Sequence, residues 1–330
     1  MAAVRKTTFA LLVLVSISSW GCEAKAVAPL RIGINPWPGY EHFYLAQELG
    51  YFEQEGVAVR IVEYPSLGDV RRAFERGQID GMGCTVVELI QARRGGRQDP
   101  KAVLVTDYSN GGDVIVAQDR IADLNDLRGH RVGVELGSLN IFLLARALEI
   151  RGASLDDVIC VPVAQADMPS ALAQGRCDAV VTYPLYLTEI ERRGGVRRLF
   201  TSAEIPGEVL DLMVVEGRAI RERPEDVSAM IRAFDRARNE ARRRPDEPAR
   251  IMAQREGLTV AEFLSCLASE IRLVEVDEQE PFLEPGGQLE RVLRDVVRVL
   301  EQTGQTRVAP LTGNEIDPEP VRRARSERGR

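Results

Sequence analysis

One local pattern recurs from residue 30 to about residue 215: a β-branched run, an amphipathic segment with apolar residues at helical spacing, and a closing glycine. The runs are Leu30–Ile34, Val57–Val62, Ala102–Val105, Val114–Ala117, Arg131–Leu136, Val158–Val163, Ala179–Thr182 and Leu212–Val215. Strand and helix in alternation are typical of parallel sheets with right-handed crossovers. The pattern therefore predicts an α/β fold built on mainly parallel, doubly wound sheets.

An internal echo suggests that this winding occurs twice. Residues 69–81 and 168–179 each contain a helical segment closed by glycine, then two residues, an aspartate and a small residue. A chain of 330 residues is long enough for two domains. Junctions from helix to glycine to strand are common, so the echo favours two similar lobes without deciding the point.

The N-terminus has the features of an export signal. Two basic residues precede the apolar run Phe9–Val15, and small residues lead to Gly21 and Cys22. We expect a signal peptide over residues 1–21, too short to span a membrane. Cysteine after a small residue resembles the bacterial lipobox, although Ser19 and Trp20 depart from it. We therefore expect an exported, periplasmic lipoprotein anchored through Cys22, with an ordinary signal peptide and a chance cysteine as the alternative.

Charge and composition exclude several kinds of site. Acidic residues number 50 against 43 basic ones, which argues against a nucleic-acid surface. There are only two histidines and no Cys-x-x-Cys spacing, so we expect no metal and no cofactor. Cys160 and Cys177 belong to predicted strands that would flank a third strand. That arrangement predicts buried thiols that lie too far apart to form a disulfide.

Several motifs resemble those of one family. Residues 32–40 read IGINPWPGY, and residues 45–57 read LAQELGYFEQEGV. This opening resembles the nitrate/sulfonate/taurine/thiamine-precursor group of ABC-importer solute-binding proteins, which have the type II periplasmic binding protein fold. Later segments also fit: GQIDG at 77–81, DLRGHRVGV at 126–134, GS at 137–138 and GRCDA at 175–179. The resemblance covers about residues 29–310.

The resemblance implies a two-lobed protein with a hinge of two crossing segments. Residues 30–113 and 212–310 would form lobe 1, and residues 114–211 lobe 2. Such a protein would capture a small organic solute by hinge closure and deliver it to ABC permease subunits in the membrane. The solute would be sulfonate- or taurine-like, or a pyrimidine or other aromatic heterocycle. We expect a monomer, with residues 311–330 as a charged flexible tail.

A candidate binding site follows from the strand order alone. In open α/β sheets, ligands bind beyond the carboxyl ends of the strands. The loops there and the adjoining crossing segment near residues 111–113 carry aromatic, hydroxyl and acidic side chains. The alternative for the tyrosines Tyr40 and Tyr183 is that each is a half-buried packing residue. The candidate ligand-binding residues are Trp37, Tyr40, Ser66, Cys84, Thr85, Ser109, Asp113, Gly137, Ser138 and Tyr183. Trp37 is the strongest, because an indole between two prolines in a loop suits stacking on a flat solute.

The residue types also bear on the charge of the ligand. Ser66, Thr85 and Ser138 precede predicted helices, whose free N–H groups could bind an anion, or these residues could act only as caps. No Lys or Arg falls in the predicted strand-end loops, and Arg71 lies a turn inside a helix. Asp113 at the first crossing could meet an amine or a ring N–H. We therefore favour a neutral, zwitterionic or heterocyclic solute over a sulfate-like anion.

Two other functions compete with solute import. The first is an enzyme on the same fold, similar to the thiamine-pyrimidine synthases or the desulfinases. The cysteine-rich stretch of those synthases has no counterpart here, although His42 falls near a loop where they carry a histidine. Cys84 would need a base or cationic surroundings to act as a nucleophile, so we expect no enzyme. The second is a sensor module that presents its ligand to a receptor.

Overall fold

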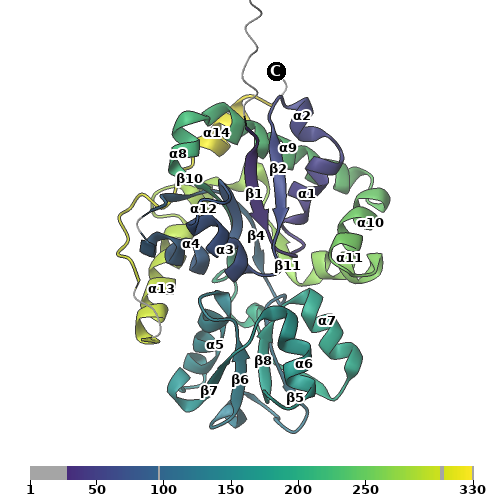
Figure 1. Cartoon of the computed structure of the whole chain (residues 1–330), viewed down its shortest axis with the longest axis vertical. Helices are drawn as coiled ribbons and strands as arrows, with labels where there is room; N and C mark the ends of the chain where they lie inside the picture. Colours follow the sequence, from purple (N-terminus) through teal and green to yellow (C-terminus); the bar gives the residue numbers. More distant parts are fainter. Residues whose placement is uncertain (1–27, 96, 305–307, 329–330) are drawn as a thin grey trace, which may run out of the picture.

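The structure is a computed structural model that describes residues 28–95, 97–304 and 308–328. The predicted signal peptide and Cys22 lie outside these residues. Two lobes lie one above the other in Figure 1, each with its own sheet.

The sheet of lobe 1 has six strands in the order β11-β4-β10-β3-β1-β2. Their bounds are Ile271–Leu273 (β11), Pro100–Ser109 (β4), Leu210–Glu216 (β10), Gly81–Thr85 (β3), Leu30–Ile34 (β1) and Val59–Glu63 (β2). β1 pairs in parallel with β2 and β3, whereas β10 runs antiparallel to β3 and β4.

The sheet of lobe 2 has five strands in the order β7-β6-β8-β5-β9. Their bounds are Ile159–Pro162 (β7), Arg131–Val134 (β6), Ala179–Thr182 (β8), Val114–Gln118 (β5) and Val196–Thr201 (β9). The predicted two-lobed α/β class is confirmed, but strand direction is mixed rather than mainly parallel. β5 and β10 arrive from the other lobe at the edge where the parallel strands end, so they run in the opposite direction.

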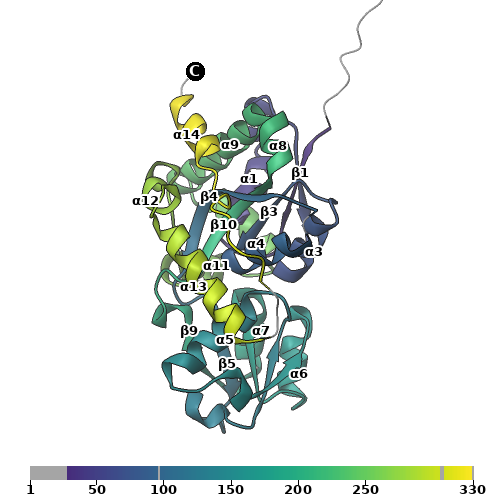
Figure 2. The same ribbon diagram turned by 90° about the vertical axis from the view of Figure 1, so that its left-hand side faces the viewer.

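Helices cover both sheets. Before the first crossing they are Glu41–Glu48 (α1), Tyr51–Gln54 (α2), Leu67–Glu75 (α3) and Val86–Ala92 (α4). Lobe 2 has Leu139–Ile150 (α5), Met168–Ala173 (α6) and Pro184–Arg193 (α7). After β10 come Gly217–Glu222 (α8), Pro224–Arg243 (α9), Asp246–Arg255 (α10), Val260–Ser269 (α11), Glu280–Leu283 (α12), Gln288–Gln302 (α13) and Glu319–Ser326 (α14). Figure 2 shows α13 reaching from lobe 1 to α5, which it contacts.

The end of the chain is more ordered than the sequence predicts. Within the predicted flexible tail 311–330, α14 packs on α9, and Ile316 forms a parallel β-bridge with Ala102. Val321 and Ala324 are buried. The prediction of a flexible tail is wrong for these residues, because two apolar side chains on a short, highly charged helix suffice to anchor it to the core.

The cysteines lie as expected from the strand order. β6 separates β7, which contains Cys160, from β8, which follows Cys177. Cys84, Cys177 and Cys266 are buried free thiols, and Cys160 is partly exposed. In the described ranges, no helix is long and apolar enough to cross a membrane, and no three His, Cys, Asp or Glu residues form a group that could hold a metal.

Candidate ligand-binding site

The carboxyl ends of the parallel strands in the two lobes face each other. On lobe 1, Thr85 ends β3, and Asp211 on β10 pairs with Thr85 on one side and Asp107 of β4 on the other. Asn35 follows β1 along the same edge. On lobe 2, Tyr183 follows β8 and reaches back to lobe 1. The strand-end residues therefore meet at one boundary between the lobes (Figure 1).

Trp37 and Tyr183 meet across this boundary. Their ring centroids are 6.4 Å apart with an interplanar angle of 79°, and both residues are almost fully buried, at 4% and 3% exposure. The Trp37 indole N–H donates to Asp107 Oδ1 at 2.9 Å. A Cβ on Gly112, in the first crossing segment, would lie 2.8 Å from the indole. The Trp37 loop is therefore fixed against both the hinge and the second lobe.

Tyr40 packs against the sheet of lobe 1, and Cys84 belongs to that sheet. The Tyr40 hydroxyl donates to Asp211 Oδ1 at 2.6 Å, and its ring packs against Gly83 of β3. Cys84 lies within β3 and is fully buried. In this conformation, both residues therefore pack within lobe 1 and stabilise the end of its sheet.

Glu88, in the first turn of α4, links the two lobes. Its Oε2 accepts hydrogen bonds from the Thr85 N–H at 3.0 Å and the Thr85 hydroxyl at 2.5 Å. Its Oε1 accepts from the N–H of Leu139, the first residue of α5, at 2.8 Å. Ser138 caps α5 and donates to the Glu135 carbonyl at 3.2 Å. The N-terminus of α5, for which the sequence left anion binding and simple capping as alternatives, is therefore occupied by a carboxylate of the chain.

A second contact between the lobes joins the loop before α3 to the loop before α5. The Ser66 hydroxyl, which caps α3, lies 2.5 Å from Glu135 Oε1. Arg71 Nε donates to the Gly137 carbonyl at 3.2 Å. Gly137 has a φ of 72°, which favours glycine at this crowded turn. Arg71 was expected inside a helix, and its side chain nonetheless reaches the other lobe.

Two tyrosines of lobe 2 close on a single backbone oxygen of lobe 1. The hydroxyls of Tyr183 and Tyr186 donate to the Pro65 carbonyl at 3.3 and 3.0 Å, respectively. Their rings lie 5.3 Å apart. Sequence reasoning missed Tyr186, although its position one helical turn after Tyr183 could have indicated that both side chains face the same way.

The first crossing segment is held by two serines. The hydroxyl oxygens of Ser109 and Ser202 lie 2.7 Å apart, and the Gly111 N–H donates to Ser202 at 2.7 Å. The Asp113 N–H donates to Ser109 at 3.0 Å. Ser109 is thus engaged in the hinge, and Asp113 lies beside it with its side chain buried.

Three aspartates near the hinge are buried, and burial is the largest cause of their altered acidity. Burial raises the pKa of Asp113 to about 7 and that of Asp107 to about 6, although the Trp37 N–H opposes the second shift. The pKa of Asp211 rises well above its usual value, because burial is reinforced by the charges of Asp107 and Asp113. These carboxyls tend to keep their protons while nothing neutralises their charge.

Cys84 and His42, the candidate catalytic residues of an enzyme on this fold, are poorly placed for catalysis. Burial raises the pKa of the Cys84 thiol well above its usual value, so it is not a thiolate at neutral pH. His42 lies edge-on to Phe234 of α9 at 6.0 Å, and burial lowers its pKa to about 3. Neither side chain provides an activated nucleophile or a general base in this conformation.

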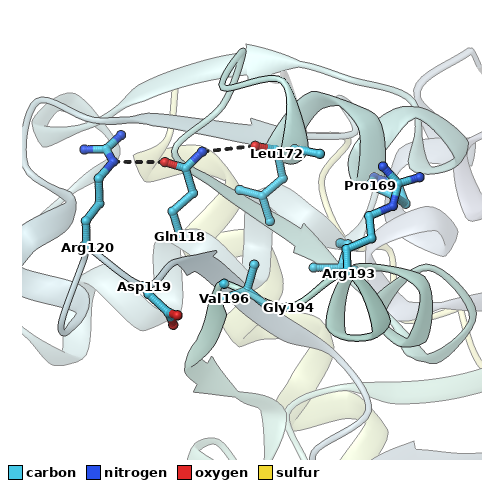
Figure 3. Close-up of a pocket in the computed structure, with 11 residues that line it drawn as sticks. Gln118, Asp119, Arg120, Pro169, Leu172, Arg193, Gly194 and Val196 are labelled. Atoms are coloured by element: carbon cyan, nitrogen blue, oxygen red, sulfur yellow. Dashed lines mark hydrogen bonds between the residues drawn. The ribbon is translucent and has the colours of Figure 1, made fainter.

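One cavity belongs to lobe 2 alone. It has a volume of about 370 Å³ and lies among β5, α6, α7 and β9 (Figure 3). Its lining includes Gln118, Arg120, Leu172 and Arg193, and Gln118 bonds to both Arg120 and the Leu172 carbonyl. None of the predicted binding residues lines this cavity.

A second cavity, of about 400 Å³, lies between the lobes. Pro184 and other residues of α7 line it from lobe 2, and Cys266 and Glu270 line it from lobe 1. The Glu270 carbonyl accepts hydrogen bonds from Asn110 and Gly112 of the hinge. Glu270 therefore connects the wall of this cavity to the crossing segment, although no residue of that segment is among those that line the cavity.

Comparison with known proteins identifies the family. The model of the family described as NMT1/THI5 like matches residues 37–248. The chain belongs to the NMT1/THI5-like family. The match includes most of the residues that form the boundary between the lobes.

Relatives of this NMT1/THI5-like chain are named as binding proteins. A Brucella abortus (strain 2308) protein named as a binding protein is 27% identical over 236 residues, covering 68% of this chain and 71% of the relative. A protein of Escherichia coli K12 named as an aliphatic sulfonates-binding protein is 28% identical over 193 residues, covering 58% of this chain and 60% of the relative.

Solved structures agree on the fold. The alkanesulfonate-binding protein SsuA from Xanthomonas axonopodis pv. citri, bound to MOPS, superposes with a TM-score of 0.74. The superposition covers 88% of this chain and 98% of SsuA at 19% identity. This NMT1/THI5-like chain therefore has the two-lobed fold of the periplasmic binding proteins.

Proposed function

We propose that the chain is the extracytoplasmic solute-binding component of an ABC importer. It captures a small organic solute between its lobes by hinge closure and delivers it to membrane permease subunits. The observation that carries this proposal is the contact of Trp37 with Tyr183, since two buried rings from opposite lobes meet where the strands of both sheets end. The names of the relatives support a binding role.

Hinge motion follows from how the lobes are joined. Residues 110–113 and 205–209 connect the strands of one lobe to those of the other. The contacts of Glu88 with Leu139 and of Ser66 with Glu135 would break on opening. A solute that contacts both lobes would favour closure, because it gains most of its interactions in the closed state.

We assign different roles to the candidate residues. Trp37 and Tyr183 would form the walls of the site, and Asp113 would contact polar groups of the solute. Four residues would surround the solute on closure: Ser66 and Thr85 from lobe 1, and Gly137 and Ser138 from lobe 2. In the present structure Glu135 and Glu88 connect these two groups, through the contacts of Glu135 with Ser66 and of Glu88 with Thr85 and Leu139. Tyr40, Cys84 and Ser109 would not contact the solute. They would hold in place the strand ends and the crossing segment that carry the contacting residues.

The proposed role includes export from the cytoplasm and attachment to the membrane. Residues 1–21 would be removed on export, and Cys22 would anchor the monomeric protein in the membrane, facing the periplasm. From the sequence we expected residues 30–113 and 212–310 as lobe 1 and residues 114–211 as lobe 2. Because Leu210 and Asp211 belong to β10 of the lobe 1 sheet, the second boundary would fall instead at residues 205–209.

Binding rather than catalysis is supported by the buried, protonated Cys84 thiol and the neutral His42. Incubation of the purified protein with each solute found to bind should return it unchanged. Turnover that is lost in a Cys84→Ser variant would favour an enzyme instead.

A thermal-shift screen tests the proposal. Sulfonates, taurine, pyrimidines and aromatic carboxylates would be added to the mature chain. A solute at 100 times its Kd should add about 2.7 kcal/mol of stability. Trp37→Ala should abolish the shift, whereas Tyr51→Ala, on α2 away from the boundary between the lobes, should retain it. Equal binding by the Trp37→Ala variant would show that the site lies elsewhere.

A further inference from the structure

The helix N-termini at the lobe boundary are already engaged by the chain's own oxygen atoms. Glu88 accepts from the first N–H of α5, and its other oxygen accepts from Thr85 before α4. The Ser66 hydroxyl accepts from the Asp69 N–H at the start of α3. An anionic ligand would therefore have to displace a buried carboxylate from α5, and it would meet the charge of Glu135 nearby.

The remaining side chains at this boundary are rich in acceptors. Asp211 and Asp107 are partners in the strand register, and their carboxyls lie close enough to share a proton. Asp113 lies near enough to Asp107 and Glu88 for their charges to raise its pKa. Arg238 is the cation that acts on Asp107, but it donates to Glu275 and to the Val274 carbonyl.

Among the described residues, two buried acceptors at the same edge have no donor beyond this shared proton. Asp211 Oδ2, in a side chain only 2% exposed, has no donor in the described ranges other than a proton it can share with Asp107. Asn35 Oδ1, in a residue 1% exposed, also has no partner among the described residues. The Asn35 side chain lies within hydrogen-bond range of Tyr183, so it faces the boundary between the lobes. Unpaired buried acceptors are costly, and a ligand N–H would satisfy them.

The buried donors that lack a hydrogen-bond partner in the described chain belong to arginines that are already held in ion pairs. In the part of the chain that the structure describes, the buried side-chain donors without a hydrogen-bond partner are single guanidinium nitrogens of three arginines. Each of these arginines already has an ion-pair partner: Arg93 with Glu315, Arg238 with Glu275 and Arg255 with Glu41. The excess of unmet acceptors at the boundary is therefore not matched by uncommitted cations of the chain.

Building on the proposed import function, we propose that the boundary between the lobes, when they close, selects a small organic cation that carries N–H donors, such as a protonated amine, an amidinium or a protonated ring. Its charged end lies against Asp113 and Asp211, and its flat or apolar part lies between Trp37 and Tyr183. Sulfonates and other anions are rejected, because they would face Glu88 and the aspartates without a compensating cation.

The buried carboxyls give this selection a second signature. Without a cation, Asp113 keeps a proton up to a pKa of about 7, and Asp107 up to about 6. The groups that face Asp113 are Glu88, Asp107, Asp211 and Glu270, all acidic, together with the Ser109 hydroxyl. A bound cation favours the ionised carboxylates, so its binding near pH 6.5 releases protons to the buffer.

Isothermal titration of the mature chain with matched probes tests the inference. Benzamidinium, benzamide and benzenesulfonate share a ring but carry positive, zero and negative charge, and propylammonium, propanamide and propanesulfonate repeat the comparison without the ring. In at least one series the cation should bind about tenfold or more tightly than the amide, and the sulfonate should not bind. Titrations in two buffers of different ionisation enthalpy should show proton release with the cation.

Variants separate charge from packing. Asp113→Asn should weaken cation binding by about tenfold or more while retaining the amide's affinity. Asp119→Asn makes the same change on a side chain 56% exposed in lobe 2 and should leave all affinities unchanged. Because Asp113→Asn could disturb folding, proton release by the unmodified chain provides an independent test.

Two outcomes would overturn the inference, and they differ in what they say of the import function. If a sulfonate binds and loses its affinity in Trp37→Ala, the import function stands and cation selection is wrong. If no cation of either series binds saturably, cation selection is likewise wrong, and the broader solute screen then decides on the import function.

Discussion

The indole of Trp37 lies edge-on to the ring of Tyr183, 6.4 Å away at 79°, and the two residues belong to opposite lobes. Both residues are almost fully buried where the two lobes meet. The chain has two tryptophans, and the other, Trp20, lies in the predicted signal peptide. Trp37 should therefore be the sole tryptophan of the mature protein and report on the state of the hinge.

The first prediction concerns this optical signal. Tyr183→Ala should shift the fluorescence maximum of the mature chain to longer wavelength, because water reaches the exposed indole. Tyr183→Phe keeps the ring and should leave the maximum unchanged. Steady-state emission spectra of the three proteins make the comparison. Identical maxima for Tyr183→Ala and the unmodified chain would mean that Tyr183 does not shield Trp37 in solution.

The second prediction concerns Glu88, whose two carboxylate oxygens serve both lobes. Glu88→Ala leaves the N–H groups of Leu139 and Thr85 without acceptors and should lower the free energy of unfolding by about 1–3 kcal/mol. Glu88→Gln retains one acceptor and should lose less. Urea denaturation measures both. A loss as large for Gln as for Ala would indicate that charge, rather than hydrogen bonding, matters at this position.

The third prediction is the pH dependence of stability. Asp113 has a folded-state pKa of about 7 against an ordinary value of 3.8. Between these values the folded chain keeps a proton that the unfolded chain has lost, so Asp113 makes stability fall as pH rises from 4 to 7.

The variant Asp113→Asn isolates this contribution from that of other carboxyls. It should be more stable than the unmodified chain at pH 8, by on the order of 2 kcal/mol, and the difference should shrink toward pH 4. Chemical denaturation across this range, with Asp119→Asn as the control, measures it. A pH-independent difference would show that Asp113 titrates normally.

Some strands could be predicted from the sequence because they contain several buried β-branched residues, whereas other strands lack that pattern. Leu30–Ile34 and Ala179–Thr182 were predicted with their observed bounds, because each contains at least two buried β-branched residues. Gly81–Thr85 has no β-branched residue except its last, and only the opening glycine suggested a strand. Val196–Thr201 contains two arginines and pairs only with β5, so its pattern lacked the apolar signal of a central strand.

The site was predictable in its location but not in its contacts. Ends of parallel strands meet by topology, so sequence indicated which loops would converge. Thr85 and Glu88 have the spacing of a capping box, a local pattern that the sequence reasoning did not use. The bond of Glu88 to Leu139 depends on the relative position of the two lobes, which no local pattern encodes. The contact of Arg71 with the Gly137 carbonyl was missed for the same reason.

The last prediction concerns the hinge. Ser202 accepts the Gly111 N–H and contacts the Ser109 hydroxyl, which in turn accepts the Asp113 N–H. Ser202→Ala removes the acceptor of Gly111 directly and frees the Ser109 side chain.

Amide hydrogen exchange followed by NMR should then show about tenfold faster exchange at Gly111, because the loss of one buried hydrogen bond is worth about 1.4 kcal/mol. Asp113 should show a smaller acceleration, since its acceptor Ser109 remains. Ser170→Ala, which removes a comparable hydroxyl from the exposed face of α6, should change neither rate. Unchanged exchange at Gly111 in Ser202→Ala would mean that packing of Trp37 on Gly112, rather than the two serines, holds the crossing segment in place.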